Sequence, residues 1–278
     1  MRIGRARVGD EERLVVERDG VLRAAAEPGV TLVDVMSRPE LVTSGAGAEE
    51  VEAGALVAPL RPGKIVAIGV NYRDHARESG AEIPERPLVF AKFPSSVIGP
   101  GAPIEIDPEA TERVDWEVEL AAVIGRRARH VSRDDALGVV YGYTAGNDIT
   151  ARDVQFGDGQ WTRGKSFDSF CPLGPLVVTA DELPDPQALE LETRVNGEVV
   201  QDSSTAEMVF GVAELIEFCS AAFTLEPGDV LLTGTPWGCG EFMDPPRSLH
   251  PGDEVVVSIG GVGSLANPVV EARRRPAS

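Results

Sequence analysis

The chain has 278 residues, a formal net charge of −19 at neutral pH and three cysteines. Such an acidic surface repels phosphate backbones and anionic lipid headgroups, which argues against binding to nucleic acid or to a membrane surface. The cysteines are odd in number and far apart, which excludes a disulfide framework and a zinc knuckle. No run approaches the roughly 18 apolar residues of a membrane span. The N-terminus has no secretory signal, so we expect a cytoplasmic protein.

Residues 1–60 are predicted to form a small N-terminal β-domain. Short alternating stretches separated by Gly and Asp are typical of a small antiparallel sheet, and they lie at residues 2–8, 14–17 and 21–25. Residues 44–50, rich in Gly, Ala and Glu, are predicted to be a loop or linker, and the Pro- and Gly-containing run 59–63 marks the boundary. Residues 61–278 are predicted to form the larger, catalytic domain.

The larger domain is predicted to be rich in strands and poor in helices. Apolar runs of strand length lie at residues 65–68, 88–92, 114–124, 139–145, 230–233 and 254–259. Helical patterns or helix starts lie at residues 71–80, 132–137, 150–156 and 209–220. Asn196 and Gly197 stand between two apolar runs, which is the strongest short-range signal of a hairpin. The sequence therefore predicts a mainly β protein, a β-rich member of the α+β class.

The strand predicted at residues 114–124 carries two carboxylates on one face. Glu117 and Glu119 are two residues apart, so their side chains point the same way, with Cα atoms roughly 6–7 Å apart. Trp116 and Val118 point to the other face. Two carboxylates so placed repel one another unless a cation lies between them. The competing interpretation is the solvated outer face of an edge strand, where paired glutamates are common.

Asp148 is a candidate third member of this carboxylate group. It follows the apolar, Gly-rich strand predicted at residues 139–145, in a position where exposure to solvent is not the default. Three converging carboxylates without a nearby His or Cys make an all-oxygen site. Hard ligands of this kind suit Mg²⁺, Mn²⁺ or Ca²⁺, with water or substrate in the remaining coordination positions.

Five short motifs, in this order and spacing, resemble those of the fumarylacetoacetate hydrolase superfamily across about residues 61 to 270. They are the pair Glu117 and Glu119, the run from Gly146 to Gln155, the run from Trp161 to Asp168, the turn from Val195 to Gly197, and the loop from Gly234 to Pro236. The resemblance implies a mixed β-sandwich roll with a metal ion at its mouth. It also implies a homodimer, and an N-terminal domain that has no chemistry of its own.

The resemblance also assigns roles to individual residues. Glu117, Glu119 and Asp148 correspond to the metal triad, which implies Mg²⁺ or Mn²⁺, while Lys165 corresponds to the site lysine and Thr235 to a substrate-contacting threonine. The implied substrate is a small 2-oxo acid, which can chelate a metal through its carboxylate and keto oxygens. The metal then acts as a Lewis acid that stabilises an enolate. The lysine supplies positive charge to a substrate oxygen and offsets the acidity of the chain.

Other residues are candidate substrate contacts. Arg152 and Gln155 are three residues apart on a predicted helix, so both lie on one face and could orient the substrate. Structural pairing of Arg152 with Asp148 or Asp153 is an equally good interpretation. Arg73, in the polar helical turn at residues 71–80, is a further candidate contact.

His75 and Glu78 are the candidate acid–base pair. At positions i and i+3 of a helical turn the carboxylate can hold the imidazole and raise its basicity. The pair resembles the His-x-x-Glu dyad of family members that activate water on a lid segment. The competing interpretation is an exposed histidine on a polar helix. His130 and His250 lie in Arg-rich and turn contexts and are predicted to be structural.

The resemblance leaves the reaction open, because one such site serves several reactions. The leading prediction is hydrolysis of a C–C bond in a 3-acylpyruvate or fumarylpyruvate, as in the breakdown of aromatic compounds. Oxaloacetate decarboxylation and 2-oxo-dienoate isomerisation are the alternatives at the same metal, and a catalytically silent β-rich binding protein is the rival class. The chain departs from the family pattern at Trp237 and Cys239, which would alter the pocket if their loop borders it.

Overall fold

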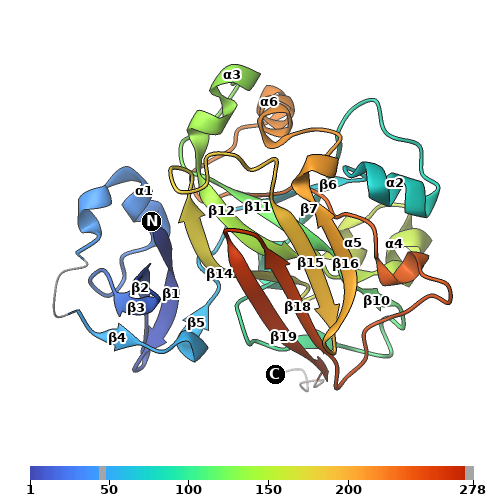
Figure 1. Cartoon of the computed structure of the whole chain (residues 1–278), viewed down its shortest axis with the longest axis horizontal. Coiled ribbons are helices and arrows are strands. Elements are labelled where there is room, and N and C mark those ends of the chain that lie inside the picture. The colour runs from blue at the N-terminus through green and yellow to red at the C-terminus, as the bar shows by residue number, and fades with distance from the viewer. Residues whose placement is uncertain (44–47, 273–278) are drawn as a thin grey trace.

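A computed structural model describes residues 1–43 and 48–272, where most of the apolar runs form strands (Figure 1). The mainly β fold expected from the sequence is confirmed. Residues 44–47 of the predicted linker, and residues 273–278, lie outside the described residues. None of the described helices has the length and apolarity needed to cross a bilayer.

The N-terminal strands form the small antiparallel sheet that their alternation predicts. Their bounds are β1 (Arg2–Val8), β2 (Glu11–Arg18), β3 (Val21–Ala24), β4 (Glu50–Val51) and β5 (Leu56–Val57), with helix α1 (Leu32–Ser37) packed beside them. This sheet continues into the rest of the molecule, because β1 pairs with β14 (Cys171–Thr179) through Arg2 opposite Val178. The elements lie together at one side of the molecule (Figure 1). The division at residue 60 stays a prediction.

Within the described residues, the largest sheet has twelve strands, and its main path runs β4-β3-β2-β1-β14-β12-β11-β17-β6-β7. The strands not yet defined are β6 (Ile65–Gly69), β7 (Leu88–Lys92), β8 (Val97–Ile98), β11 (Val118–Ile124), β12 (Val140–Asn147) and β17 (Val230–Leu232). The sheet is mixed: β17 runs parallel to β6 and β8 parallel to β14, while β11 and β12 are antiparallel.

A second sheet of the described chain has five strands in the order β16-β15-β18-β19-β9. These are β9 (Ile104–Ile106), β15 (Glu190–Val195), β16 (Glu198–Ser204), β18 (Glu254–Ile259) and β19 (Gly263–Glu271). The predicted hairpin joins β15 to β16, and Asn196 and Gly197 both adopt positive φ angles, 52° and 83°. Asn and Gly tolerate that conformation best, which explains the signal in the sequence. A short pair, β10 (Val114–Asp115) and β13 (Thr150–Ala151), completes the strands.

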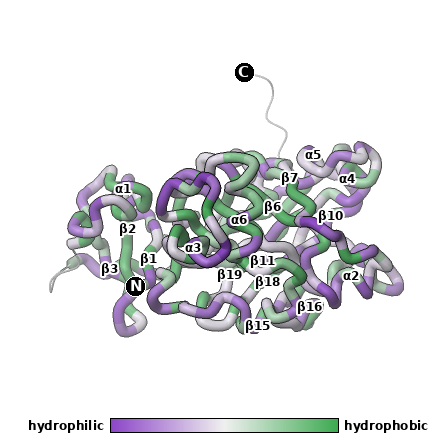
Figure 2. Tube along the Cα trace, turned by 90° about the horizontal axis from the view of Figure 1, so that it is seen from above, coloured by the Kyte–Doolittle hydropathy of each residue, from purple (hydrophilic) through white to green (hydrophobic). Residues whose placement is uncertain are grey.

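The two large sheets pack face to face around a shared hydrophobic core (Figure 1). Leu191 and Val257 of the smaller sheet are buried in one cluster with Val118 and Leu120 of the larger sheet. Each such side chain contributes about 1.5–3 kcal/mol when it is fully buried. Helix α6 (Val212–Ala222) covers the same core with its apolar stripe, and Figure 2 shows hydrophobic segments concentrated along these central elements.

The remaining helices are short and lie mainly at the end of the sandwich away from the N-terminal strands. They are α2 (Arg73–Ser79), α3 (Arg133–Ala136), α4 (Arg152–Asp158) and α5 (Thr162–Lys165). The predicted N-cap at Ser132 is confirmed, since its side chain accepts the Asp135 N–H. The 3₁₀ turns are η1 (Pro39–Leu41), η2 (Ala53–Ala55), η3 (Pro94–Ser96), η4 (Leu137–Val139), η5 (Thr205–Glu207) and η6 (Gly240–Phe242). Helices α2, α4 and α5 gather at one end of the sheets (Figure 1).

The prediction of one uninterrupted strand at residues 114–124 is wrong near its start. The chain leaves β10 after Asp115 and enters β11 only at Val118. At the break, side chains take the place of a neighbouring strand as hydrogen-bond acceptors. The Glu117 N–H donates to Asn147 Oδ1 at 3.0 Å, and the Val118 N–H donates to Gln201 Oε1 at 3.0 Å. Every backbone donor therefore still has a partner there, as burial requires.

Candidate metal centre and active site

The pairing of β11 with β12 brings the three predicted carboxylates together. Glu117 directly precedes β11 and Asp148 directly follows β12, where Val118 is opposite Asn147. The Asp148 N–H donates to the Glu117 carbonyl at 2.9 Å. One oxygen from each of Glu117, Glu119 and Asp148 lies within 4.8 Å of the other two. The residues are only 5%, 1% and 0% exposed, which contradicts the interpretation as a solvated strand face.

Three buried cations surround this carboxylate cluster, which we define as Glu117, Glu119 and Asp148. Lys165 Nζ lies 2.8 Å from Glu117 Oε2 and 2.8 Å from Asp148 Oδ2. Lys92 Nζ lies 2.5 Å from Asp148 Oδ1, and Arg152 Nη2 lies 2.7 Å from Glu117 Oε1. Buried charges are costly unless they are paired and hydrogen-bonded. The cluster is therefore tolerated in the interior because the fold supplies its own cations.

The pKa values of the two glutamates are shifted in opposite directions. Burial favours the neutral form of Glu117, but Lys165 and Arg152 outweigh burial and lower its pKa to about 2. The pKa of Glu119 is raised well above its usual value by burial and by repulsion from Asp148 and Glu117. Glu119 is thus the member of the cluster whose negative charge is least compensated by the protein.

The surroundings of Glu119 fit a hard divalent cation. Its Oε2 accepts the Gly234 N–H at 2.7 Å, while its Oε1 is buried and has no hydrogen-bond partner among the described residues. A buried carboxylate oxygen without a partner is costly, and a bound cation removes that cost. The three side chains offer only oxygen ligands, which suit Mg²⁺ or Mn²⁺.

Two further charged residues of the site were not predicted. Lys92, the last residue of β7, also donates to the carbonyls of Ile149 and Lys165. Asp115 accepts from Arg152 Nε at 2.8 Å and from the Gly240 N–H at 2.7 Å. Both residues end or interrupt predicted apolar strands, and a charged residue inside such a run is the signal that could have revealed them.

Arg152 pairs with other carboxylates than those considered from the sequence. It binds Asp115 and Glu117, whereas pairing with Asp148 or Asp153 was expected as the structural alternative. Its Nη1 donates to Gln155 Oε1 at 3.1 Å, as the i, i+3 spacing on α4 allows. Arg152 thus joins the predicted substrate contact Gln155 to the carboxylate cluster.

A cavity of about 220 Å³ lies beside the cluster. Its polar lining includes His75, Glu117, Arg152, Gln155, Lys165 and Thr235. Phe90, Trp161 and Phe242 supply aromatic walls, with Phe90 and Trp161 packed edge to face. The cavity therefore brings six of the residues singled out from the sequence into one space with predominantly apolar walls.

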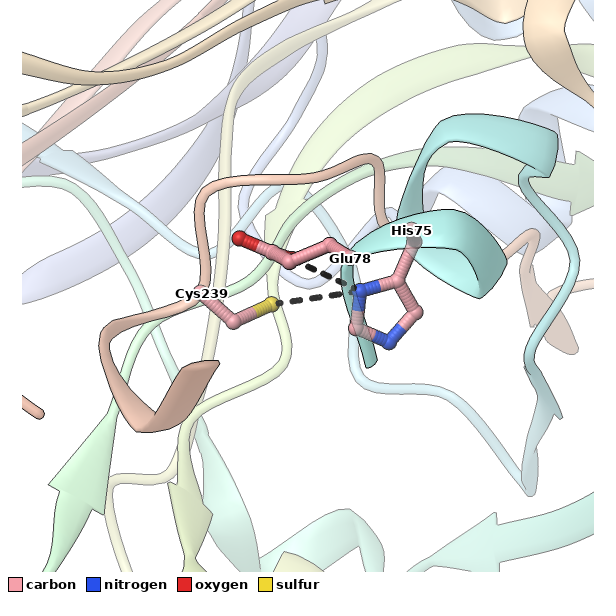
Figure 3. Close-up of side chains that lie close together, drawn as sticks. All are labelled: His75, Glu78 and Cys239. Atoms are coloured by element: carbon pink, nitrogen blue, oxygen red, sulfur yellow. Dashed lines mark hydrogen bonds and ion pairs between the residues drawn. The ribbon is translucent and has the colours of Figure 1, made fainter. Parts of the chain in front are cut away.

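His75 and Glu78 lie on α2 and contact one another (Figure 3). His75 Nδ1 is 3.3 Å from Glu78 Oε2, and Glu78 Oε1 accepts the Gly238 N–H at 2.8 Å. His75 is 8% exposed and its ring packs edge to face on Phe242, which contradicts the exposed-histidine interpretation. Because the carboxylate accepts the Nδ1 proton, the lone pair of the neutral ring lies on Nε2.

The remaining candidates lie outside this arrangement or serve the fold. The Arg73 guanidinium donates to the carbonyls of Met208 at 2.5 Å and Glu207 at 3.3 Å, and Arg73 is not among the residues that line the cavity. Trp237 is 43% exposed and its indole donates to the Asp202 carbonyl, so its ring does not narrow the cavity. Cys239, by contrast, is buried with its sulfur 3.9 Å from His75 Nδ1. His130 and His250 are exposed.

Fold and site together define a β-sandwich protein in which three buried carboxylates able to hold a cation lie beside a contacting histidine and glutamate. The family model described as fumarylacetoacetate (FAA) hydrolase C-terminal matches residues 64–270. Mitochondrial oxaloacetate tautomerase Fahd2a of Rattus norvegicus is 48% identical over 216 residues, which is 77% of this chain and 69% of the relative. The chain belongs to the fumarylacetoacetate hydrolase family.

Solved structures agree with this assignment over nearly the whole chain. Fumarylacetoacetate hydrolase from Exiguobacterium antarcticum matches with a TM-score of 0.89 and 38% identity, covering 98% of this chain and 100% of that one. Maleylpyruvate hydrolase from Sphingobium sp. SYK-6, solved with manganese(II) and pyruvate, matches with a TM-score of 0.82 and 29% identity at the same coverage of 98% and 100%. The relatives with named activities are therefore enzymes, and they catalyse more than one reaction.

Proposed function

We propose that the chain is a divalent-metal-dependent enzyme that transfers a proton at the carbon next to the keto group of a small 2-oxo acid. Keto–enol tautomerisation of a short 2-oxo diacid of the oxaloacetate kind is the proposed reaction. The observation that carries the proposal is the convergence of His75 and Lys165 on one cavity beside the carboxylate cluster. The 48% identity with an oxaloacetate tautomerase supports the choice of substrate.

The carboxylate cluster is the proposed metal site. Glu117, Glu119 and Asp148 would hold Mg²⁺ or Mn²⁺, which supplies Lewis acidity toward the keto and carboxylate oxygens of a bound 2-oxo acid. Lys165 lines the cavity and carries a positive charge fixed by two carboxylates, so it can stabilise negative charge that develops on a substrate oxygen.

Arg152, Gln155 and Thr235 are the proposed orienting groups for the substrate. All three line the cavity. Thr235 Oγ1 accepts a hydrogen bond from Gln201 Nε2 at 3.0 Å, so the hydroxyl proton of Thr235 stays available to donate to a substrate carboxylate. Gln201 itself is fully buried, and its Oε1 binds the Val118 N–H and Thr193. The amide thus fixes the position of the threonine relative to β11.

His75 is the proposed general base and acid. With Nδ1 held by Glu78, Nε2 can take a proton from the substrate carbon and return it to an oxygen, or perform the reverse. Phe242, packed on the imidazole, and the other aromatic walls keep the ring in a largely apolar environment. Such an environment strengthens the electrostatic interactions with the developing negative charge.

Hydrolysis of a 3-acylpyruvate or fumarylpyruvate, the leading prediction from the sequence, is the second candidate. The observation that favours it is the His75–Glu78 contact, because an imidazole held by a carboxylate can equally activate water. The likeness to maleylpyruvate hydrolase supports this choice. Decarboxylation of oxaloacetate and 2-oxo-dienoate isomerisation use the same proposed enolate stabilisation and are the remaining alternatives.

An activity panel on chelator-treated protein tests the proposal. Oxaloacetate tautomerisation is followed by loss of enol absorbance, decarboxylation by pyruvate formation, and C–C hydrolysis by loss of acylpyruvate or fumarylpyruvate. We expect tautomerisation that disappears with chelator and returns with Mg²⁺ or Mn²⁺. Metal-dependent cleavage of an acylpyruvate without tautomerisation would move the assignment to the second candidate. Tautomerisation indifferent to chelator, or no turnover of any substrate, would contradict the proposal.

Assembly and location are also proposals. A homodimer is typical of the family that the sequence resembles, and sedimentation equilibrium at micromolar concentration tests it directly. A cytoplasmic location follows from the sequence expectation of a reducing environment, and the three cysteines are unpaired and buried in the structure.

A further inference from the structure

His75, Glu78 and Cys239 form a second group of metal-ligating side chains, separate from the carboxylate cluster (Figure 3). One ligand atom from each lies within 4.8 Å of the other two. His75 Nδ1 is 3.3 Å from Glu78 Oε2 and 3.9 Å from Cys239 Sγ. Helix α2 supplies the first two residues at i and i+3, and the loop before η6 brings in the cysteine from 164 positions along the chain.

We propose that this group is a binding site for Zn²⁺ or a similar borderline divalent cation, and that the bound cation inhibits the enzyme. Zinc binds nitrogen and oxygen at about 2.0–2.2 Å and sulfur at about 2.3 Å in tetrahedral geometry, which places neighbouring ligand atoms roughly 3.3–3.8 Å apart. The separations of 3.3 Å and 3.9 Å at His75 are close to that range. Small side-chain rotations therefore complete a three-ligand site, with water as the fourth ligand.

Neighbouring groups already orient these ligands. The Gly238 N–H donates to Glu78 Oε1, which leaves Oε2 directed at His75. Gln201 Nε2 lies 4.0 Å from Cys239 Sγ and can donate to the thiolate that a cation would create. Such outer contacts fix ligand geometry in metal sites. An ion and its water have a route in, because the imidazole lines the cavity and the Glu78 side chain is 16% exposed.

The two groups select different cations. The carboxylate cluster offers three hard oxygens and suits Mg²⁺ or Mn²⁺, whereas the second group offers nitrogen, oxygen and sulfur. Thiolate and imidazole ligands strongly favour Zn²⁺ and Co²⁺ over Mg²⁺. Saturating Mg²⁺ therefore occupies the first site and leaves the second to zinc-class ions. Binding there displaces the Cys239 thiol proton, which passes to water.

The inhibitory effect rests on the proposed function of His75. Coordination through Nδ1 uses the lone pair of that nitrogen, so the ring proton must reside on Nε2. The imidazole then has no lone pair left to accept a proton from substrate. The same ion also takes the Glu78 carboxylate that holds the ring in its active tautomer. A cation at this site thus removes the base without occupying the carboxylate cluster.

Cobalt binding tests the site itself, independently of activity. The wild-type protein is saturated with Mg²⁺ and titrated with Co²⁺, and the sulfur-to-cobalt charge-transfer absorption in the near ultraviolet is recorded. An all-oxygen site gives no such band, so the band reports the cysteine. We expect a band that saturates at one Co²⁺ per chain and is abolished by added Zn²⁺. Absence of the band in the wild-type protein overturns the proposal.

Matched cysteine variants identify the ligand. Cys239→Ser should lose the band and bind Co²⁺ at the second site at least about tenfold more weakly, since even outer-shell changes cost that much. Cys219→Ala is the control, because Cys219 is buried in α6 away from both groups, and it should keep the band. A band that persists in Cys239→Ser overturns the assignment. Circular dichroism of each variant confirms that it is folded.

Zn²⁺ inhibition, measured at saturating Mg²⁺, tests the second part of the proposal, that the bound cation inhibits the enzyme. The wild-type protein and Cys219→Ala should lose activity as Zn²⁺ is added and recover it when Zn²⁺ is chelated. Cys239→Ser should need at least about tenfold more Zn²⁺ for the same fractional loss of its own activity. A cobalt band without zinc inhibition would overturn the inhibitory role but would still support the metal site. The absence of any activity to inhibit would instead count against the proposed function.

Discussion

Glu117 of the carboxylate cluster and His75 of the His75–Glu78 dyad line the same cavity, but the two groups are built in different ways. Glu119 lies in β11 and Asp148 directly follows β12, and these two strands pair in the large sheet. Both residues are at most 1% exposed, and Asp148 contacts the cations of Lys92 and Lys165. The dyad lies on the seven-residue helix α2, with side chains 10% and 16% exposed, and is held by a loop N–H and an aromatic edge. The first region is fixed by buried ion pairs, and the second by a few hydrogen bonds and one ring contact.

This difference suggests a division of labour. A metal site gains from rigid ligands whose charge cannot relax into water, which the central sheet provides. A group that takes up and releases protons benefits from a partly accessible environment, which a short helix at the cavity provides. The two regions should therefore respond differently to substitution, and four predictions test that contrast.

The largest effect is expected at Glu119. Glu119→Gln keeps the size of the side chain but removes the charge, and the hydrogen bond from Gly234 can remain. We expect metal affinity to collapse and kcat/KM to fall by about 10³-fold or more, the equivalent of several kcal/mol of Lewis-acid stabilisation. Steady-state kinetics with an Mg²⁺ titration checks this. A variant with near wild-type activity and metal affinity would contradict the role of the cluster.

Lys92→Met tests how much a buried ion pair of the carboxylate cluster contributes to the stability of the fold. It leaves Asp148 without one of its buried cations, and we expect the free energy of unfolding to fall by about 3 kcal/mol. Arg127→Met is the control, because Arg127 and its partner Glu226 are 66% and 50% exposed, so their pairing should be worth less than about 1 kcal/mol. Urea unfolding measures both. Equal losses of unfolding free energy in the two variants would show that burial of the ion pair does not determine its contribution to stability.

His75→Gln should separate catalysis from metal binding. Loss of the general base should lower kcat by about 10²-fold, while the affinity for Mn²⁺ at the carboxylate cluster stays unchanged. His130→Gln, at an exposed position, should leave both unchanged. If His75→Gln retains full activity, the base is a different group. If it loses Mn²⁺ instead, the two regions are not independent.

The smallest effect is expected at Glu78. Glu78→Gln can keep the hydrogen bond from Gly238 but weakens the hold on the imidazole, so kcat should fall by about tenfold. Glu82→Gln, just beyond α2 and exposed, is the control and should match the wild-type protein. A loss as large as that of His75→Gln would show that Glu78 itself contacts the reacting atoms.

Much of this arrangement could be predicted from local patterns. The hairpin at Asn196 and Gly197 follows from residues that accept positive φ, and β6 follows from a short apolar run. The approach of Glu117 to Asp148 was predicted because Glu117 lies on the polar face of one predicted strand and Asp148 at the end of another, and the family motifs placed both in one site. These features depend on neighbours in sequence or on a shared motif.

Other features depend on contacts that a local pattern does not contain. The strand β14 was not predicted, because Pro172, Gly174 and Pro175 disfavour strands, yet it pairs with both β12 and β1. The burial of Lys92 depends on Asp148, 56 positions away. The break before β11 depends on the side chain of Gln201, 83 positions away.

Counting bound manganese against activity tests the central claim most directly. Chelator-treated protein is titrated with Mn²⁺, bound ion is measured by electron paramagnetic resonance, and oxaloacetate tautomerisation is measured in the same samples. We predict that activity rises in proportion to bound Mn²⁺ up to one ion per chain. Glu119→Gln should bind none at these concentrations, and His75→Gln should bind one ion with little activity. Full activity in samples without bound ion, or equal binding by Glu119→Gln and the wild-type protein, would contradict the account.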